Sequence, residues 1–139
     1  MTMHTESYSH AEDAENRNVL RSMLRGFHCR CPRCGEGAMF KSYLEVNDHC
    51  PVCDLALFHQ RADDAAPYFV ILIVGHIIIG SLLFVDSTWH PAVWLQTLIW
   101  IPLTIILSLL LLPRAKGTII GLQWANRMHG FGGGADSTP

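Results

Sequence analysis

The chain has 139 residues, enough for about one domain. Half of its residues are hydrophobic and 16% are charged, compared with about 25% charged residues in a typical soluble domain. The formal net charge of -2 lacks the basic surplus expected of a nucleic-acid-binding protein. Composition therefore argues against a nucleic-acid partner and indicates a chain with a large apolar portion.

The chain begins with a polar, acidic segment, residues 1–16, that contains no apolar run. It resembles neither a signal peptide nor an amphipathic transit peptide, and we expect a disordered tail. We expect the same of residues 132–139 at the other end, which read GGGADSTP.

Residues 17–28 combine a basic and an apolar pattern. Arg17, Arg21 and Arg25 recur at every fourth position, while the apolar residues between them fall on one helical face. This pattern predicts a basic amphipathic helix suited to the anionic cytosolic leaflet of a membrane. A helix that packs on the metal-binding segment after it is the alternative.

The strongest chemical signal lies within residues 29–60, as two Cys-x2-Cys pairs separated by 15 residues. This spacing is typical of zinc sites. Each pair closes a tight turn that points two thiolates at one ion, and two turns supply a tetrahedral site with four sulfur ligands. We therefore predict a small zinc-ribbon-like β knuckle, stapled by its metal, with the ligands Cys31, Cys34, Cys50 and Cys53.

Other uses of the cysteines are less well supported. Gly35 and Asp54 follow the two pairs where covalent c-type haem attachment would require histidine. Disulfides do not suit the reducing cytosol, whereas iron in a four-sulfur site stays open, since such coordination does not separate iron from zinc. A fifth cysteine, Cys29, stands beside His28 and is either a spare thiol or a metal-relay or redox thiol.

Residues 61–113 contain two apolar runs, about 68–85 and 93–112, without Asp, Glu, Lys or Arg. About 20 helical residues cover the roughly 30 Å hydrocarbon core of a bilayer. The short connection Asp86–Ala92 makes the two helices antiparallel neighbours. Seven Lys or Arg residues precede the first run, three follow the second and none lies between, which places both termini in the cytosol.

Ionisable residues at and within the first run are further candidates for function. Arg61, Asp63 and Asp64 immediately precede it, either as a helix cap with favourable acids or as a cluster that binds a partner or an ion. His76 lies inside the run, where an ionisable group is a functional candidate by default. Haem or copper ligation and proton transfer are its candidate roles. The alternative is a neutral histidine hydrogen-bonded to Thr97, Thr104 or Ser108.

After the second run, residues 114–131 place Ile120, Trp124 and Met128 four residues apart along one helical face. This spacing predicts an interfacial helix on the cytosolic leaflet. A helix that docks the zinc-binding segment is the alternative.

Several of these motifs occur together in order between about Leu24 and Phe131. They are Cys31-Pro-Arg-Cys34-Gly-Glu-Gly37, the pair Cys50 and Cys53, Arg61-Ala-Asp-Asp64, Gly75-His76, Pro113-Arg-Ala-Lys-Gly117, and Gly121-Leu-Gln-Trp124 through Met128-His-Gly-Phe131. In this set the chain resembles a family of small bacterial membrane proteins called domain of unknown function 983. The resemblance implies a zinc-ribbon-like arm and two membrane spans. The resemblance also implies that genes of this family occur near genes for cytochrome oxidase assembly. Such a gene neighbourhood is an association and gives no mechanism.

We therefore expect a mainly α membrane protein of the bacterial inner membrane, with a two-helix transmembrane hairpin and a cytosolic arm that holds structural zinc. No serine elbow, P-loop or His-Glu-x-x-His motif is present. A non-enzymatic accessory, scaffold or assembly factor is the favoured function, with other integral membrane proteins such as cytochrome oxidase components as partners. The alternatives are a copper or haem handling protein that uses Cys29 and His76, and an enzyme that uses Asp63 and Asp64.

Overall fold

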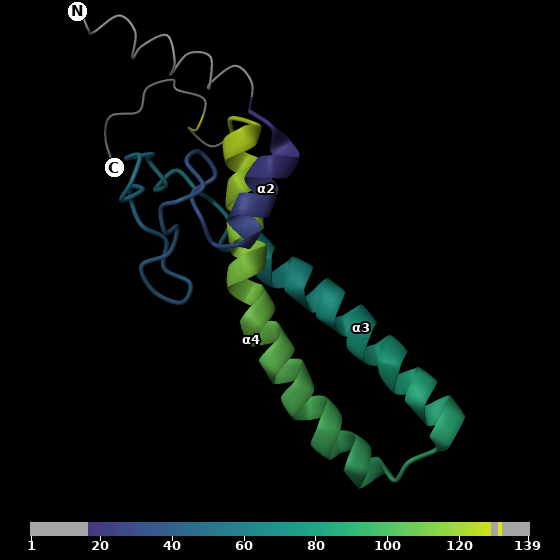
Figure 1. The fold of residues 1–139 in the computed structure, drawn as a ribbon. Coiled ribbons are helices and arrows are strands. Elements are labelled where there is room, and N and C mark those ends of the chain that lie inside the picture. The colour runs from purple at the N-terminus through teal and green to yellow at the C-terminus, as the bar shows by residue number, and fades with distance from the viewer. Residues whose placement is uncertain (1–16, 129–130, 132–139) are drawn as a thin grey trace, which may run out of the picture.

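A computed structural model of the chain describes residues 17–128 and residue 131. The described residues form three helices, α2 (Val19–Phe27), α3 (Ala65–Trp89) and α4 (Val93–Ala125). Helices α3 and α4 make a long hairpin, and α2 lies beside the end of α4 that is remote from the hairpin turn (Figure 1). The expected tails, residues 1–16 and 132–139, lie outside the described residues.

The hairpin buries only a narrow stripe of its apolar surface. Val70, Val74 and Ile78 recur at every fourth position of α3 and pack against α4, partly on Trp100 and Leu107. The other faces of α3 and of residues 93–112 of α4 are mostly apolar and open to the surroundings. By length and composition, α3 and α4 are each able to cross a membrane, and they include the two expected spans.

The turn between the two helices is shorter than the expected connection Asp86–Ala92. Helix α3 continues through Asp86 to Trp89, and His90 then reverses the chain in the left-handed conformation, with φ of 44°. The Asp86 carboxylate accepts a hydrogen bond from the Gln96 side chain at 2.9 Å. The carboxylate therefore has a hydrogen-bond donor at the turn of the hairpin, and α3 continues past it.

Helix α4 does not stop at the end of the second apolar run. It continues through Pro113 to Ala125, so the separate helix expected over residues 114–131 is instead an extension of α4. Proline lacks the N–H that would bond to the carbonyl four residues earlier. That carbonyl, on Leu109, accepts a hydrogen bond from the Tyr43 hydroxyl. A side chain from the cysteine-containing segment therefore replaces the missing helical bond.

Helix α2 packs on the α4 extension through small residues. Its buried positions are Ser22 and Gly26, which face Gly121 and Gly117 of α4 in antiparallel order. A Cβ atom built on Gly117 would lie 2.0 Å from the carbonyl oxygen of Gly26. The two backbones therefore touch, as in helix pairs with small residues at four-residue spacing.

The helix predicted within residues 17–28 is present as α2, and its apolar side faces outward. The buried face of α2 is the small-residue face, whereas the apolar residues Leu20 and Leu24 are exposed. Helix α2 runs along the α4 extension (Figure 1) instead of presenting its apolar face to the rest of the chain. The contact of α2 with α4 leaves open whether the exposed apolar side lies on a membrane surface, as predicted.

Residues 29–60, called the cysteine arm below, form no β-strand. The expected β knuckle consists of three isolated antiparallel bridges, Arg30 to Ala38, Phe40 to Val46 and His49 to Ala56. Tight turns at both cysteine pairs interrupt the chain too often for a longer ladder to form. The arm is held by a small core instead, in which Cys31, Met39, Cys50 and Leu57 pack with Ile120 and Trp124 of α4.

The contact between α2 and α4 can be tested at Gly117. The substitution Gly117→Ala should lower the free energy of unfolding by about 1–3 kcal/mol, because its methyl group forces two backbones apart. Denaturant unfolding in detergent, followed by tryptophan fluorescence, measures this change.

The matched control is Gly80→Ala, since no heavy atom lies within 4 Å of a Cβ at Gly80. Because alanine favours the helix more than glycine does, Gly80→Ala should raise the free energy of unfolding by up to about 1 kcal/mol. Equal stability of the two variants would contradict the close approach of α2 and α4.

Candidate metal centre

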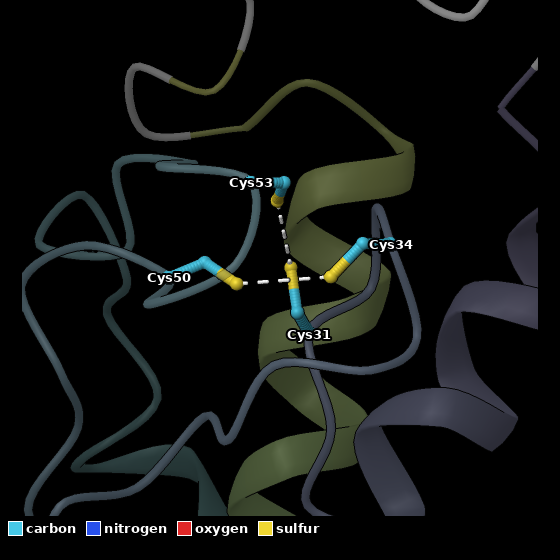
Figure 2. A group of neighbouring side chains, drawn as sticks. All are labelled: Cys31, Cys34, Cys50 and Cys53. Atoms are coloured by element: carbon cyan, nitrogen blue, oxygen red, sulfur yellow. Dashed lines mark hydrogen bonds between the residues drawn. The ribbon is translucent and has the colours of Figure 1, made fainter.

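The four cysteines of the two Cys-x2-Cys pairs converge on one point (Figure 2). Their sulfur atoms all lie within 4.8 Å of one another. The Sγ atoms of Cys31 and Cys53 are 3.6 Å apart, and those of Cys34 and Cys50 are 3.7 Å apart. A tetrahedral site with zinc–sulfur bonds of about 2.3 Å requires sulfur–sulfur distances of about 3.8 Å. The four thiols are therefore positioned to bind a metal ion.

The two cysteine turns share one backbone design. In the first turn, the N–H of Gly35 donates to the carbonyl of Cys31 at 2.9 Å, and Gly35 has φ of 74°. In the second, the N–H of Asp54 donates to the carbonyl of Cys50 at 3.0 Å, and Asp54 has φ of 57°. Glycine and aspartate are among the residues that tolerate this left-handed conformation. Each turn thus presents its two sulfurs on the same side.

Helix α2 holds the first turn in place through Arg25. One terminal nitrogen of its guanidinium donates to the carbonyls of Pro32 and Arg33, at 3.1 and 2.7 Å. The stem of Arg25 also lies against Gly35, where a Cβ would come within 2.8 Å of the Nε atom. The position of the first cysteine pair is therefore fixed relative to α2.

Gly37 brings the two turns together. A Cβ at Gly37 would lie 2.2 Å from the sulfur of Cys50, and its N–H donates to the sulfur of Cys34 at 3.4 Å. This glycine thus contacts one ligand from each pair. Sequence reasoning did not assign it this role, because nothing in the local pattern indicates that the second turn packs against it.

The surroundings of the sulfurs favour one thiolate in particular. Burial raises the pKa of Cys34, but hydrogen bonds from the backbone N–H groups of Gly37 and Glu36 outweigh burial and lower it to about 7. Burial raises the pKa of Cys31, which lies deeper. Because a metal ligates the thiolate form, ion binding at neutral pH would displace a proton from Cys31, whose pKa is raised.

The DUF983 family, described as proteins of unknown function, matches residues 40–124. This match covers more than half of the 139 residues. The chain belongs to the DUF983 family. The matched region contains the second cysteine pair, all of α3 and nearly all of α4. No curated protein and no solved structure matches the chain.

Cys29 of this DUF983 protein lies outside the group of four sulfurs. Its backbone is in the left-handed conformation, with φ of 59°, and its carbonyl accepts a hydrogen bond from Met39 at 3.1 Å. Burial raises the pKa of the Cys29 thiol, although the charge of Arg114 opposes that shift. A thiol with a raised pKa is a poor nucleophile at neutral pH.

Arg61, Asp63 and Asp64 each make different contacts in the structure. The backbone N–H and carbonyl of Arg61 both bond to the side-chain amide of Gln123, each at 3.0 Å. Asp63 forms an ion pair with the buried Lys116 of α4. Asp64 occupies the N-cap position of α3, but its side chain makes no capping hydrogen bond.

These contacts join the start of α3 to the α4 extension. Lys116 also donates to the carbonyl of Leu44 at 2.7 Å, so this one ammonium group links α4, the cysteine arm and the residues before α3. Sequence reasoning missed Lys116 and Gln123 as partners. In the sequence, these two residues are marked only by being polar within a largely apolar helix.

His76 is not bonded to the second apolar helix. Its Nδ1 atom lies 2.7 Å from the carbonyl oxygen of Leu72 on its own helix, and its side chain is exposed. No hydrogen bond from His76 to α4 is formed, and Thr97 and Thr104 donate to backbone carbonyls of α4 itself. His76 and Cys29 do not join the four cysteines in one metal-binding group.

The contact at Gly37 can be tested by the metal content of the full chain in detergent. Gly37→Ala should weaken zinc binding by about 10–100-fold, the usual effect of disturbing the groups that orient metal ligands. Competition with a coloured zinc chelator measures the affinity.

Three variants serve as controls: Glu36→Ala changes an exposed neighbour in the same turn, whereas Cys29→Ser and His76→Ala change residues outside the site. All three should retain one zinc ion per chain. Unchanged affinity in Gly37→Ala would contradict the packing of the turns. Copper or haem lost with Cys29→Ser and His76→Ala would instead favour a handling protein.

Proposed function

We propose that this DUF983 protein is an integral membrane protein whose cytosolic arm is folded by one structural zinc ion, and that it acts as a non-enzymatic scaffold or assembly factor. One observation carries the proposal. The core that contains Cys31 and Cys50 includes Ile120 and Trp124, which belong to the same helix as the second apolar run. A metal-stabilised arm is thereby built directly on one end of an apolar hairpin.

The donor set supports zinc in a structural role. Four cysteine sulfurs complete a tetrahedral shell, so no position is left for water or substrate. A closed site of this kind stabilises a small fold whose own apolar core is limited. Iron accepts the same ligands, and the metal content of the purified chain distinguishes the two.

The exposed side chains of α3 and α4 support insertion into a bilayer. Aromatic residues stand near both ends of the hairpin: Tyr68 at one end is 73% exposed, and Trp89 and Trp94 at the other are each 70% exposed. Aromatic side chains of this kind favour the interface between lipid and water. The excess of Lys and Arg outside the hairpin turn supports a cytosolic arm and an inner-membrane location.

The hairpin also offers a surface to other membrane helices. Gly75 and Gly80 of α3 have no heavy atom within 4 Å of a built Cβ position. Small residues on an open helix face allow another helix to approach closely within the bilayer. We propose other integral membrane proteins as partners, and components of a bacterial cytochrome oxidase under assembly are the favoured candidates.

Affinity purification from native membranes in mild detergent tests this function. The tagged chain is expressed at its natural level as wild type, as Cys31→Ser, which lacks a metal ligand, and as Glu36→Ala, a matched variant with all four ligands. Oxidase subunits should be recovered with the wild type and Glu36→Ala. Recovery with Cys31→Ser should be at least severalfold lower, because its arm is unfolded.

Quantitative mass spectrometry compares the three samples at equal amounts of the tagged chain. Recovery of no integral membrane protein above an untagged strain would contradict the scaffold function. Equal recovery with all three variants would contradict a role for the folded arm.

A further inference from the structure

A basic cleft, which the proposed function does not use, opens between α2, the end of α4 and the first cysteine turn. Its volume is about 200 Å³, and none of the residues from 17 to 128 that line it carries a carboxylate. Four arginines form much of its wall: Arg17, Arg21, Arg25 and Arg33. Positive groups gathered in a concave, low-dielectric site focus their field and attract anions. Helix α2 adds to this field, since it begins here and has no acidic residue in its first turn.

Two buried donors in this region lack acceptors. The Nε atom of Arg17 and the Nε1 atom of Trp124 are buried and have no hydrogen-bond partner among the described residues. Both residues line the basic cleft, and Trp124 is only 7% exposed. Indole and guanidinium nitrogens can donate but not accept. Both atoms are closed to solvent, so a ligand with acceptor oxygens would reach them only after the Arg17 side chain moved off the Trp124 ring.

Two of the four arginines, Arg17 and Arg25, are already held in position. Arg17 stacks on the Trp124 ring at 4.5 Å and donates from one terminal nitrogen to the carbonyls of Trp124 and Phe131, at 2.7 and 3.0 Å. Arg25 is fixed in the same way by the carbonyls of the first cysteine turn. Burial, followed by the charges of Arg127 and Arg33, lowers the pKa of Arg17, so the crowding of positive charge has a cost. An anion in the cleft would offset that cost.

We propose that the basic cleft binds the phosphate group of a soluble anion. Arginine forks match the geometry of phosphate oxygens, and prepositioned guanidinium groups lose little entropy when they bind. This site is separate from the metal centre, although the first cysteine turn forms part of its wall.

A lipid headgroup carries the same chemistry, but the position of the cleft favours a ligand from solution. Trp124 lies 12 residues beyond Leu112, where the second apolar run ends. At 1.5 Å per residue this is about 18 Å along the helix. The headgroup layer on each side of a bilayer is only about 5–8 Å thick. The distance of the cleft from the bilayer rests on the membrane topology proposed above. The existence of the cleft does not depend on that topology.

Titration calorimetry of the zinc-loaded full chain with inorganic phosphate and pyrophosphate tests the proposal. The chain is placed in nanodiscs of neutral lipid, and a second preparation contains anionic phosphatidylglycerol. Arg21→Gln and Arg17→Gln should each weaken binding at least about tenfold, the effect of one lost charge-assisted hydrogen bond. Arg30→Gln is the matched control, because it removes the same charge from an exposed residue that does not line the cleft, and it should bind as the wild type does.

Each outcome decides for or against the site. Binding that is lost in both cleft variants, retained in Arg30→Gln and equal in the two lipids supports it. Absence of binding, or equal binding by all variants, would overturn it. Competition by phosphatidylglycerol would overturn a soluble ligand and assign the site to a headgroup. Phosphate binding only after Glu12, Asp13 and Glu15 are changed to their amides would show that the chain's own acidic residues are the ligand, and it too would overturn the proposal.

Discussion

The close contact between α2 and α4 is the constraint on which the arrangement outside the hairpin depends. Gly26 and Gly117 touch backbone to backbone, and any larger side chain at either position would overlap a carbonyl oxygen. Only at this separation does α2 run directly along the α4 extension. From that position Arg25 reaches the carbonyls of the first cysteine turn, and the arm closes its small core on Trp124. The metal centre and the basic cleft therefore both depend on four small residues that bind no ligand themselves: Ser22, Gly26, Gly117 and Gly121.

The continuity of α4 is what couples the arm to the hairpin. A helix that ended at Pro113 would leave the cysteine arm on a flexible joint. Instead, Tyr43 satisfies the carbonyl that proline cannot reach, and Lys116 bonds both to the arm and to Asp63 before α3. Forces on the arm are thus passed to both apolar helices. For a proposed scaffold this rigidity matters, because a partner bound to the arm is held in a defined position relative to the hairpin.

The features that could be predicted from the sequence are those encoded over short distances. The Cys-x2-Cys spacing by itself places two sulfurs in one turn, and composition by itself identifies an apolar run. The four-sulfur group and both long helices were therefore predicted. The pairing of Gly117 with Gly26, the hydrogen bond from Tyr43 to Leu109 and the ion pair of Lys116 were not, since each joins residues far apart in the chain. The same limit explains the errors at Pro113 and at the β knuckle. In both places local rules for proline and for strand formation were overridden by tertiary contacts and by closely spaced turns.

The most direct test is whether α2 and the α4 extension stay packed together without the metal. Amide hydrogen exchange of the full chain, measured with zinc bound and again after chelation, answers this question. Chelation should expose the amides of the cysteine arm, such as those of Met39 and Leu57, within the exchange time of a denatured loop. Helix α2 and the α4 extension should keep most of their protection, because their contact is made by backbone packing. Loss of protection in α2 together with the arm would contradict this account. It would show that the metal, and not the glycine contact, holds the helices together.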